Sequence, residues 1–111
     1  MVEKERIWEL RFEFLRFASN MPEVRKADLC VLGYLVATYN VREDKSWPGI
    51  DTMASAVSMG RSQVLRSIRQ LIGLRLLTLV SKEGPGKYVY RPAFERVTLP
   101  TRQSKSSEPR W

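Results

Sequence analysis

Residues 50–74 constrain the fold more than any other stretch, because two short helical patterns meet there across a tight turn. The first pattern places Met53, Ala54 and Val57 on one face. The second repeats apolar and small residues at spacings of three and four, which share one face of a helix. That face consists of Val64, Ser67, Ile68, Leu71 and Leu74. The sequence therefore predicts two helices that pack on one core.

The opposite face of the second helix is basic. It carries Arg61, Ser62, Leu65, Arg66 and Arg69. Ser58, Met59 and Gly60 form the predicted turn, so the helix begins at Arg61 with backbone amides free to meet an anion. A helix with one apolar and one basic face can lie on a protein core and in a DNA groove together.

Positive charge is concentrated in this helix pair and in the residues after it. The formal net charge of the chain is +7. Residues 1–51 hold eight Lys or Arg against nine Asp or Glu, a net of −1, whereas residues 52–91 hold seven against Glu83 alone, a net of +6. This asymmetry indicates a polyanionic partner. The competing interpretation is a solvated basic surface that serves only solubility.

Composition limits the remaining function classes. A chain of 111 residues that is 43% hydrophobic suits one domain with its own core. We expect no membrane span and no signal peptide, because no apolar run is long enough and the N-terminus mixes acids with bases. Histidine is absent, which excludes a Cys/His zinc site and imidazole catalysis, so we expect no metal, no cofactor and no enzyme. A single cysteine, Cys30, favours a reducing cytoplasm.

Residues 3–19 predict a helix, although their apolar residues partly alternate as in a strand. Glu, Arg and Leu favour the helix, and no turn residue interrupts them. Apolar residues cover more than half of its circumference, so we expect burial on two sides. Residues 1–21 are therefore either a dimerisation element or a helix that only completes the core.

Residues 22–99 form the main predicted domain, and residues 100–111 form a polar, basic tail that we expect to be disordered. Its first helix is predicted over residues 25–39, with Cys30 packed in the core as a small hydrophobe. The apolar stripe of this helix consists of Leu29, Leu32, Val36 and Tyr39. Residues 93–99 are expected to pack back on the domain.

The loop over residues 41–49 ends in Trp47-Pro48, and Gly49 is predicted to cap the next helix. A lone Trp at such a position can anchor the loop in the core or stack on nucleic acid. Packing in the core is the favoured interpretation for Trp47.

A β-hairpin is predicted near the end of the domain. Residues 76–81 and 87–91 are rich in β-formers, and residues 82–86 (KEGPG) have turn chemistry. The tip of this hairpin would carry Lys82 and Lys87.

This order of elements, with a basic helix directly before a hairpin, resembles the winged helix-turn-helix family from about Lys26 to Pro92. The likeness is to small helix-turn-helix proteins of bacteria, phages and plasmids. The matching features are Trp47-Pro48, the apolar-Ala pair Met53-Ala54, the helix start Met59-Gly60-Arg61-Ser62-Gln63-Val64, and Leu71-Ile72-Gly73-Leu74-Arg75-Leu76-Leu77. The resemblance implies a mainly α fold with a small β-hairpin, in which a winged helix-turn-helix follows an extra N-terminal helix.

Three positions depart from the family pattern. Ser58 and Arg75 stand where the family usually has Gly, and Gly60 stands where it usually has a Ser or Thr cap. If Ser58 and Arg75 adopt left-handed backbone conformations, each costs on the order of 1 kcal/mol.

The resemblance implies sequence-specific binding of double-stranded DNA through a recognition helix over about 61–73 and a basic wing over about 82–87. The expected DNA-binding residues are Arg61, Ser62, Gln63, Arg66, Arg69, Lys82 and Lys87. We expect a homodimer that acts as a bacterial or mobile-element transcription regulator, or in plasmid or phage maintenance. The alternative is a winged-helix protein-interaction module in a replication-initiation or partition assembly. Two features favour that alternative. One is Leu65 within the basic face, and the other is the aromatic N-terminal helix, which would bind the protein partner.

Overall fold

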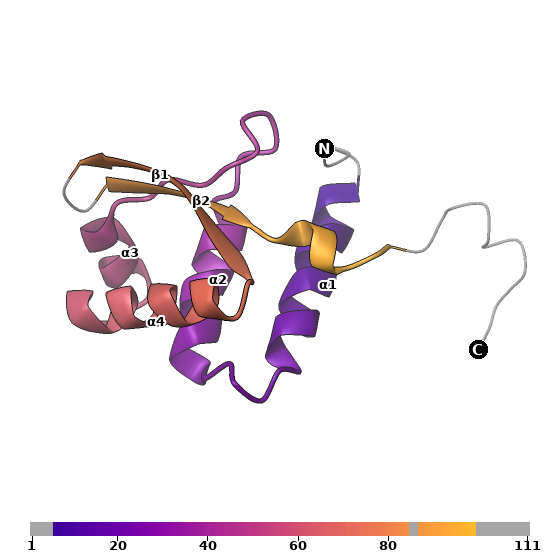
Figure 1. Ribbon diagram of the computed structural model, residues 1–111, viewed down its shortest axis with the longest axis horizontal. Helices are drawn as coiled ribbons and strands as arrows, with labels where there is room; N and C mark the ends of the chain where they lie inside the picture. The colour runs from indigo at the N-terminus through magenta and orange to yellow at the C-terminus, as the bar shows by residue number, and fades with distance from the viewer. Residues whose placement is uncertain (1–5, 85–86, 100–111) are drawn as a thin grey trace, which may run out of the picture.

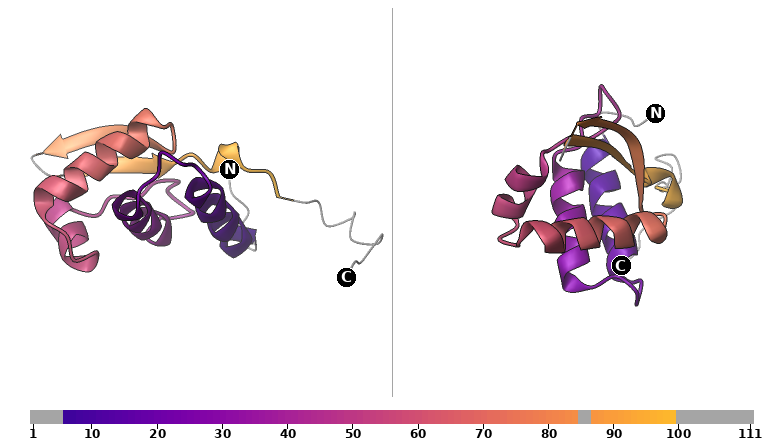
Figure 2. Two further views of the ribbon diagram at one scale, coloured as in Figure 1. Left: turned by 90° about the horizontal axis from the view of Figure 1, so that it is seen from below. Right: turned by 60° about the vertical axis from the view of Figure 1, so that its left-hand side comes forward.

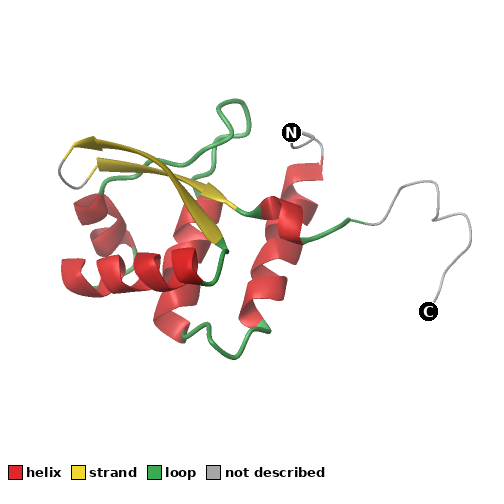
Figure 3. Cartoon of the chain, viewed as in Figure 1, coloured by secondary structure: helices red, strands yellow, loops and turns green. Residues whose placement is uncertain are grey.

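The computed structural model describes residues 6–84 and 87–99, and in this part of the chain four α-helices precede a two-stranded antiparallel hairpin (Figure 3). The helices are α1 (Ile7–Ser19), α2 (Lys26–Ala37), α3 (Ile50–Ala56) and α4 (Arg61–Gly73), the strands are β1 (Leu77–Gly84) and β2 (Lys87–Pro92), and a short 3-10 turn, η2 (Phe94–Arg96), comes after them. The predicted mainly α class with one small hairpin is confirmed. The predicted tail, residues 100–111, lies outside the described residues.

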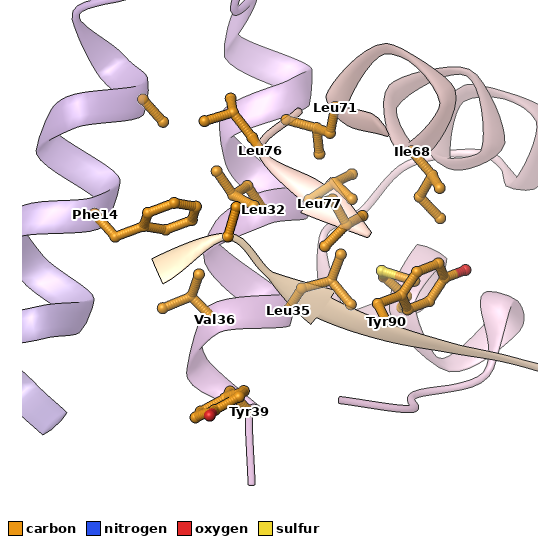
Figure 4. Packing of buried hydrophobic residues seen from close by; sticks show 14 of the residues in the cluster. Phe14, Leu32, Leu35, Val36, Tyr39, Ile68, Leu71, Leu76, Leu77 and Tyr90 are labelled. Carbon is orange, nitrogen blue, oxygen red and sulfur yellow. The ribbon is translucent and has the colours of Figure 1, made fainter. Parts of the chain in front are cut away.

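The core lies where α1, α2 and α4 meet the base of the hairpin. In Figure 1, α1 and α2 lie side by side, and α4 crosses α2 steeply. Figure 4 shows Phe14 of α1 packing toward α2, with Leu32 and Leu35 between it and α4. The Phe94 ring lies edge-on to Phe14, with ring centroids 5.2 Å apart. Residues 93–99 therefore pack back on the helices through Phe94, as predicted.

The turn between α3 and α4 has the predicted conformation. Gly49 and Gly60 are the N-caps of α3 and α4, both with extended backbone. Ser58 in the turn and Arg75 after α4 have φ angles of 56° and 62°. Both non-glycine residues thus occupy the left-handed region, where a Cβ atom is disfavoured.

The hairpin is longer than predicted, because residues assigned to its turn continue the ladder. Lys82 pairs with Tyr88, and Gly84 pairs with Lys87, with an irregularity that leaves Glu83 outside the pairing. A bulge of this kind lets a strand continue past an extra residue. The prediction that Lys82 sits at the tip is therefore wrong: it belongs to β1.

A third extended segment joins the hairpin through Ser46. The Ser46 amide donates to the Tyr90 carbonyl over 2.8 Å, and the Tyr90 amide donates to the Ser46 carbonyl over 2.7 Å. Ser46 is buried, and its hydroxyl is 2.8 Å from that of Thr38 at the end of α2. This bridge fixes the loop before α3 against β2.

Two predicted core residues are on the surface. Trp47 is 49% exposed. Neighbouring side chains of an extended segment point to opposite faces, so the inward position of Ser46 turns Trp47 outward. Cys30 is also exposed, because the buried face of α2 is formed mainly by Val31, Leu32, Leu35 and Val36.

Helix α1 is buried on one side only. Ile7, Phe14 and Ala18 lie in the core, whereas Trp8 is 74% exposed and Phe12 is 65% exposed. This one-sided burial is compatible with both roles predicted for the helix, a dimerisation element or a helix that only completes the core. Within the described residues, no helix is both long and apolar enough to cross a membrane.

Candidate nucleic-acid interface

Helix α4 has the two faces that its sequence predicts. Its inner face is buried by Val64, Ser67, Ile68 and Leu71. Its outer face is exposed at all five predicted contact positions, which are Arg61, Ser62, Gln63, Arg66 and Arg69. Inner burial fixes the helix, and thereby fixes the positions from which these side chains project.

The N-terminus of α4 combines polar side chains with backbone donors. Its Gly60 cap supplies no side-chain acceptor, so the first amides of the helix have no capping side chain. The Arg61 guanidinium donates to Asp51 of α3, with Nη1 and Oδ1 2.7 Å apart. Both side chains are largely exposed, at 50% and 85%. The pair holds Arg61 beside the helix start while leaving it accessible to solvent.

Further along α4, the arginines border an open depression of about 530 Å³. It is lined by Arg66, Arg69 and Gln70 of α4 and by Arg25 from the start of α2. Gln70 links α4 to the loop that leads into α2, because its side-chain amide donates to the Glu23 carbonyl over 3.2 Å. The depression thus gathers three guanidinium groups from two helices.

Arg25 is held in place by a buried carboxylate, Asp28. Asp28 accepts bonds from the backbone amide, Nε and Nη2 of Arg25 at 3.0, 3.1 and 3.2 Å. Burial alone would raise the pKa of Asp28, but the bonds from Arg25 and from the Ser67 hydroxyl hold it below its ordinary value of 3.8. Ser67 belongs to α4, so this carboxylate ties Arg25 to the helix that carries Arg66 and Arg69.

The wing cations lie apart from this depression. Lys82 and Lys87 are both exposed on the hairpin, which in Figure 1 extends toward the end of the molecule where α4 begins. Figure 2 shows the hairpin running alongside α4. The Lys82 Nζ lies 5.7 Å from the Tyr88 ring centroid, and Lys87 borders a separate hollow with Trp47. The structure therefore brings Arg66 and Arg69 together, and leaves Lys82 and Lys87 on a second element.

Between α4 and the hairpin lies a groove of about 270 Å³ that is mostly apolar. It is lined by Leu65, Ile68, Arg69, Ile72, Leu79, Tyr88 and Tyr90. Tyr90 is 1% exposed, and its hydroxyl has no hydrogen-bond partner among the described residues. In Figure 4 this hydroxyl points away from Leu32 and Leu35. Burial and the neighbouring Tyr88 raise the pKa of Tyr90, so the hydroxyl keeps its proton at neutral pH.

Sequence reasoning missed two residues of this surface. The sequence shows Arg25 only as a cation near the start of a helix, whereas its place beside Arg66 and Arg69 depends on how α2 and α4 pack. Trp47 was predicted in the core, yet it lies beside Lys87 and under Lys45, whose Nζ is 5.8 Å from the indole centroid. Trp47 is exposed because its side chain and that of Ser46 point to opposite faces. This orientation depends on the pairing of Ser46 with Tyr90, which the local sequence does not specify.

Neither a metal centre nor a known relative assists the assignment. Across residues 6–84 and 87–99, no cluster of three or more His, Cys, Asp or Glu side chains is arranged to hold a metal ion. No protein-family model, no curated protein and no solved structure matches the chain.

Proposed function

We propose that this chain is a winged helix-turn-helix protein that binds double-stranded DNA in a sequence-specific manner. The observation that carries the proposal is the outer face of α4, which exposes three arginines and two smaller polar residues while its inner face is fixed in the core. A major groove is about 12 Å wide and admits one such helix.

The arrangement of the other elements supports the winged layout. Helix α2 is followed by α3 and α4 across a tight turn, and the hairpin comes directly after α4. The Ser46–Tyr90 bridge attaches the loop between α2 and α3 to strand β2 of the hairpin. In this layout α4 is the recognition helix and β1–β2 is the wing.

The roles of the contacts derive from side-chain chemistry. Arg61, Ser62 and Gln63 occupy the first turn of α4, from which recognition helices reach base edges. Arg pairs in a bidentate manner with guanine, and Gln pairs with adenine. Lys82 and Lys87 on the wing bind the flanking backbone or the minor groove. With about six phosphate contacts, the logarithm of affinity falls with the logarithm of salt with a slope near −5.

A DNA-binding protein of this size is suited to act as a homodimer. The exposed Trp8 and Phe12 lie one turn apart on α1, and an exposed aromatic pair of this kind is suited to burial against a second copy. Two copies related by a two-fold axis would read half-sites about one helical turn apart. The biological role we propose is transcription regulation in a bacterium or mobile element, or plasmid or phage maintenance.

Selection from a random pool of DNA duplexes tests the proposal. The account predicts enrichment of one sequence, and loss of its binding by Arg61→Ala and Arg66→Ala variants that remain folded. Unchanged binding by both variants would overturn the assignment of α4 as the recognition helix.

A second candidate function is a protein-interaction module for a replication or partition assembly. The groove between α4 and the hairpin favours it, because Leu65, Ile72 and Leu79 offer an apolar partner side chain a place to pack. A Leu65→Lys variant separates the two functions. It adds a charge that blocks an apolar partner, whereas on DNA it leaves affinity equal or higher.

A further inference from the structure

We infer that the depression between α2 and α4 is a binding site for a nucleic-acid backbone phosphate, and that Arg25 of α2 is one of its ligands. This inference rests on the proposed function and adds to it a contact outside the recognition helix and the wing. Asp28 acts as a positioning residue that orients Arg25.

The charge around the depression is the first reason. Within the described residues, neither Arg66 nor Arg69 forms an ion pair, whereas Arg25 is paired with Asp28. Three guanidinium groups line one hollow, and Asp28 pairs with only one of them. Like charges held close together repel, and a bound anion relieves that repulsion.

The donors available on Arg25 are the second reason. A guanidinium has five N–H donors, and two of them, on Nε and Nη2, bond Asp28. Three donors therefore remain, on a side chain that is 55% exposed beside the hollow. A guanidinium fixed on one edge by a carboxylate presents its other edge in a set direction, which suits two-point binding of a phosphate.

The position of the depression along α4 fits a phosphate of the bound strand. Arg69 is seven residues beyond Ser62, which at 1.5 Å per residue is roughly 10 Å along the helix. A strand that borders the major groove lies at about that distance from bases read by the first turn. The anion that this site binds is therefore a DNA phosphodiester, which reaches it when α4 occupies the major groove.

The test compares Arg25→Ala with Lys26→Ala on one enriched duplex and one random duplex across a salt series. Lys26 is the adjacent exposed cation, and both variants lose one charge. The Asp28 bond to the backbone amide of residue 25 survives in Arg25→Ala. We expect Arg25→Ala to lower the affinity for both duplexes by a similar factor of about 10. It should also reduce the steepness of the salt dependence by about 1, whereas Lys26→Ala should change neither quantity much.

A second arm replaces single phosphates by neutral methylphosphonates. One replacement should weaken DNA binding by the wild type by at least the factor seen for Arg25→Ala. The same replacement should weaken binding by Arg25→Ala by a smaller factor, as a shared contact requires. If wild type binds DNA but Arg25→Ala binds it equally well with the same slope, the phosphate site is wrong and the proposed function stands. If wild type binds no duplex even at low salt, both are wrong.

Discussion

Asp51 of α3 accepts a hydrogen bond from Arg61 of α4, and this contact ties the first residue that we propose reads a base to a carboxylate beside the expected DNA surface. On bound DNA that carboxylate would compete with the phosphates for Arg61 and repel them. We predict that Asp51→Asn raises DNA affinity by about three- to tenfold at low salt, since a surface charge interaction is worth about 1 kcal/mol.

The matched control is the same substitution in an Arg61→Ala background, measured by fluorescence anisotropy. The gain should shrink there if Asp51 acts through Arg61. Stability should change by no more than about 0.5 kcal/mol, because both groups are on the surface. Equal affinities of Asp51→Asn and wild type would contradict the placement of Asp51 at the interface.

The buried carboxylate of Asp28 predicts a pH dependence of stability. Its pKa is lowered in the folded chain, so its contribution is present above its ordinary value of 3.8 and is lost as pH falls through the folded value. Asp28→Asn should cost about 1–3 kcal/mol at pH 7, because Ser67 and Arg25 lose a charged acceptor.

Urea unfolding at pH 7 and at pH 3 checks this prediction. The difference in the free energy of unfolding between wild type and Asp28→Asn should be smaller at pH 3 than at pH 7. Asp44, whose pKa is also lowered although burial opposes the shift, is present in both chains and cancels in the comparison. If this difference in the free energy of unfolding is the same at both pH values, the carboxylate charge does not stabilise the fold.

Backbone strain in the turn before α4 predicts a stabilising substitution. Ser58 has a φ of 56°, and glycine adopts this region without a Cβ penalty. We predict that Ser58→Gly raises the free energy of unfolding by up to about 1 kcal/mol. Ser55→Gly is the matched control, because it places the same change in the regular helix α3 and should destabilise by several tenths of a kcal/mol. A loss of stability in both variants would contradict the strain.

The exposed face of α1 predicts the oligomeric state. Replacing Trp8 and Phe12 together by Ser should convert a dimer to a monomer in sedimentation experiments. The fold should remain, because neither side chain is in the core. Binding to a palindromic site should weaken, while binding to an isolated half-site should not. A wild-type chain that sediments as a monomer at tens of micromolar would contradict this interface.

Apolar spacing predicted α2, α3 and α4, because each has an apolar face that a core must cover. Helix-forming residues predicted α1, and β-forming residues on either side of a turn sequence predicted the hairpin. The exposed positions of α4 follow from the same reasoning, since burial of Val64, Ile68 and Leu71 necessarily exposes Arg66 and Arg69. The left-handed conformations of Ser58 and Arg75 were predictable only because the family pattern places glycine there.

The errors arise where position depends on a distant part of the chain. Trp47 faces solvent because Ser46 pairs with Tyr90, a contact between residues far apart in the sequence. Arg25 joins the basic surface because α2 and α4 cross, and Asp28 is buried for the same reason. Lys82 belongs to strand β1 because a bulge at Glu83 lets the strand pairing continue as far as Gly84. The turn residues of the local sequence do not predict this bulge.

The most direct test of DNA recognition is a titration of the chain against an enriched duplex and a random duplex at two salt concentrations. We expect tight binding to the enriched site, weaker binding to the random one, and a log–log salt slope near −5 for the enriched site. Weak binding that is indifferent to sequence, even at low salt, would contradict the account and favour the protein-interaction module.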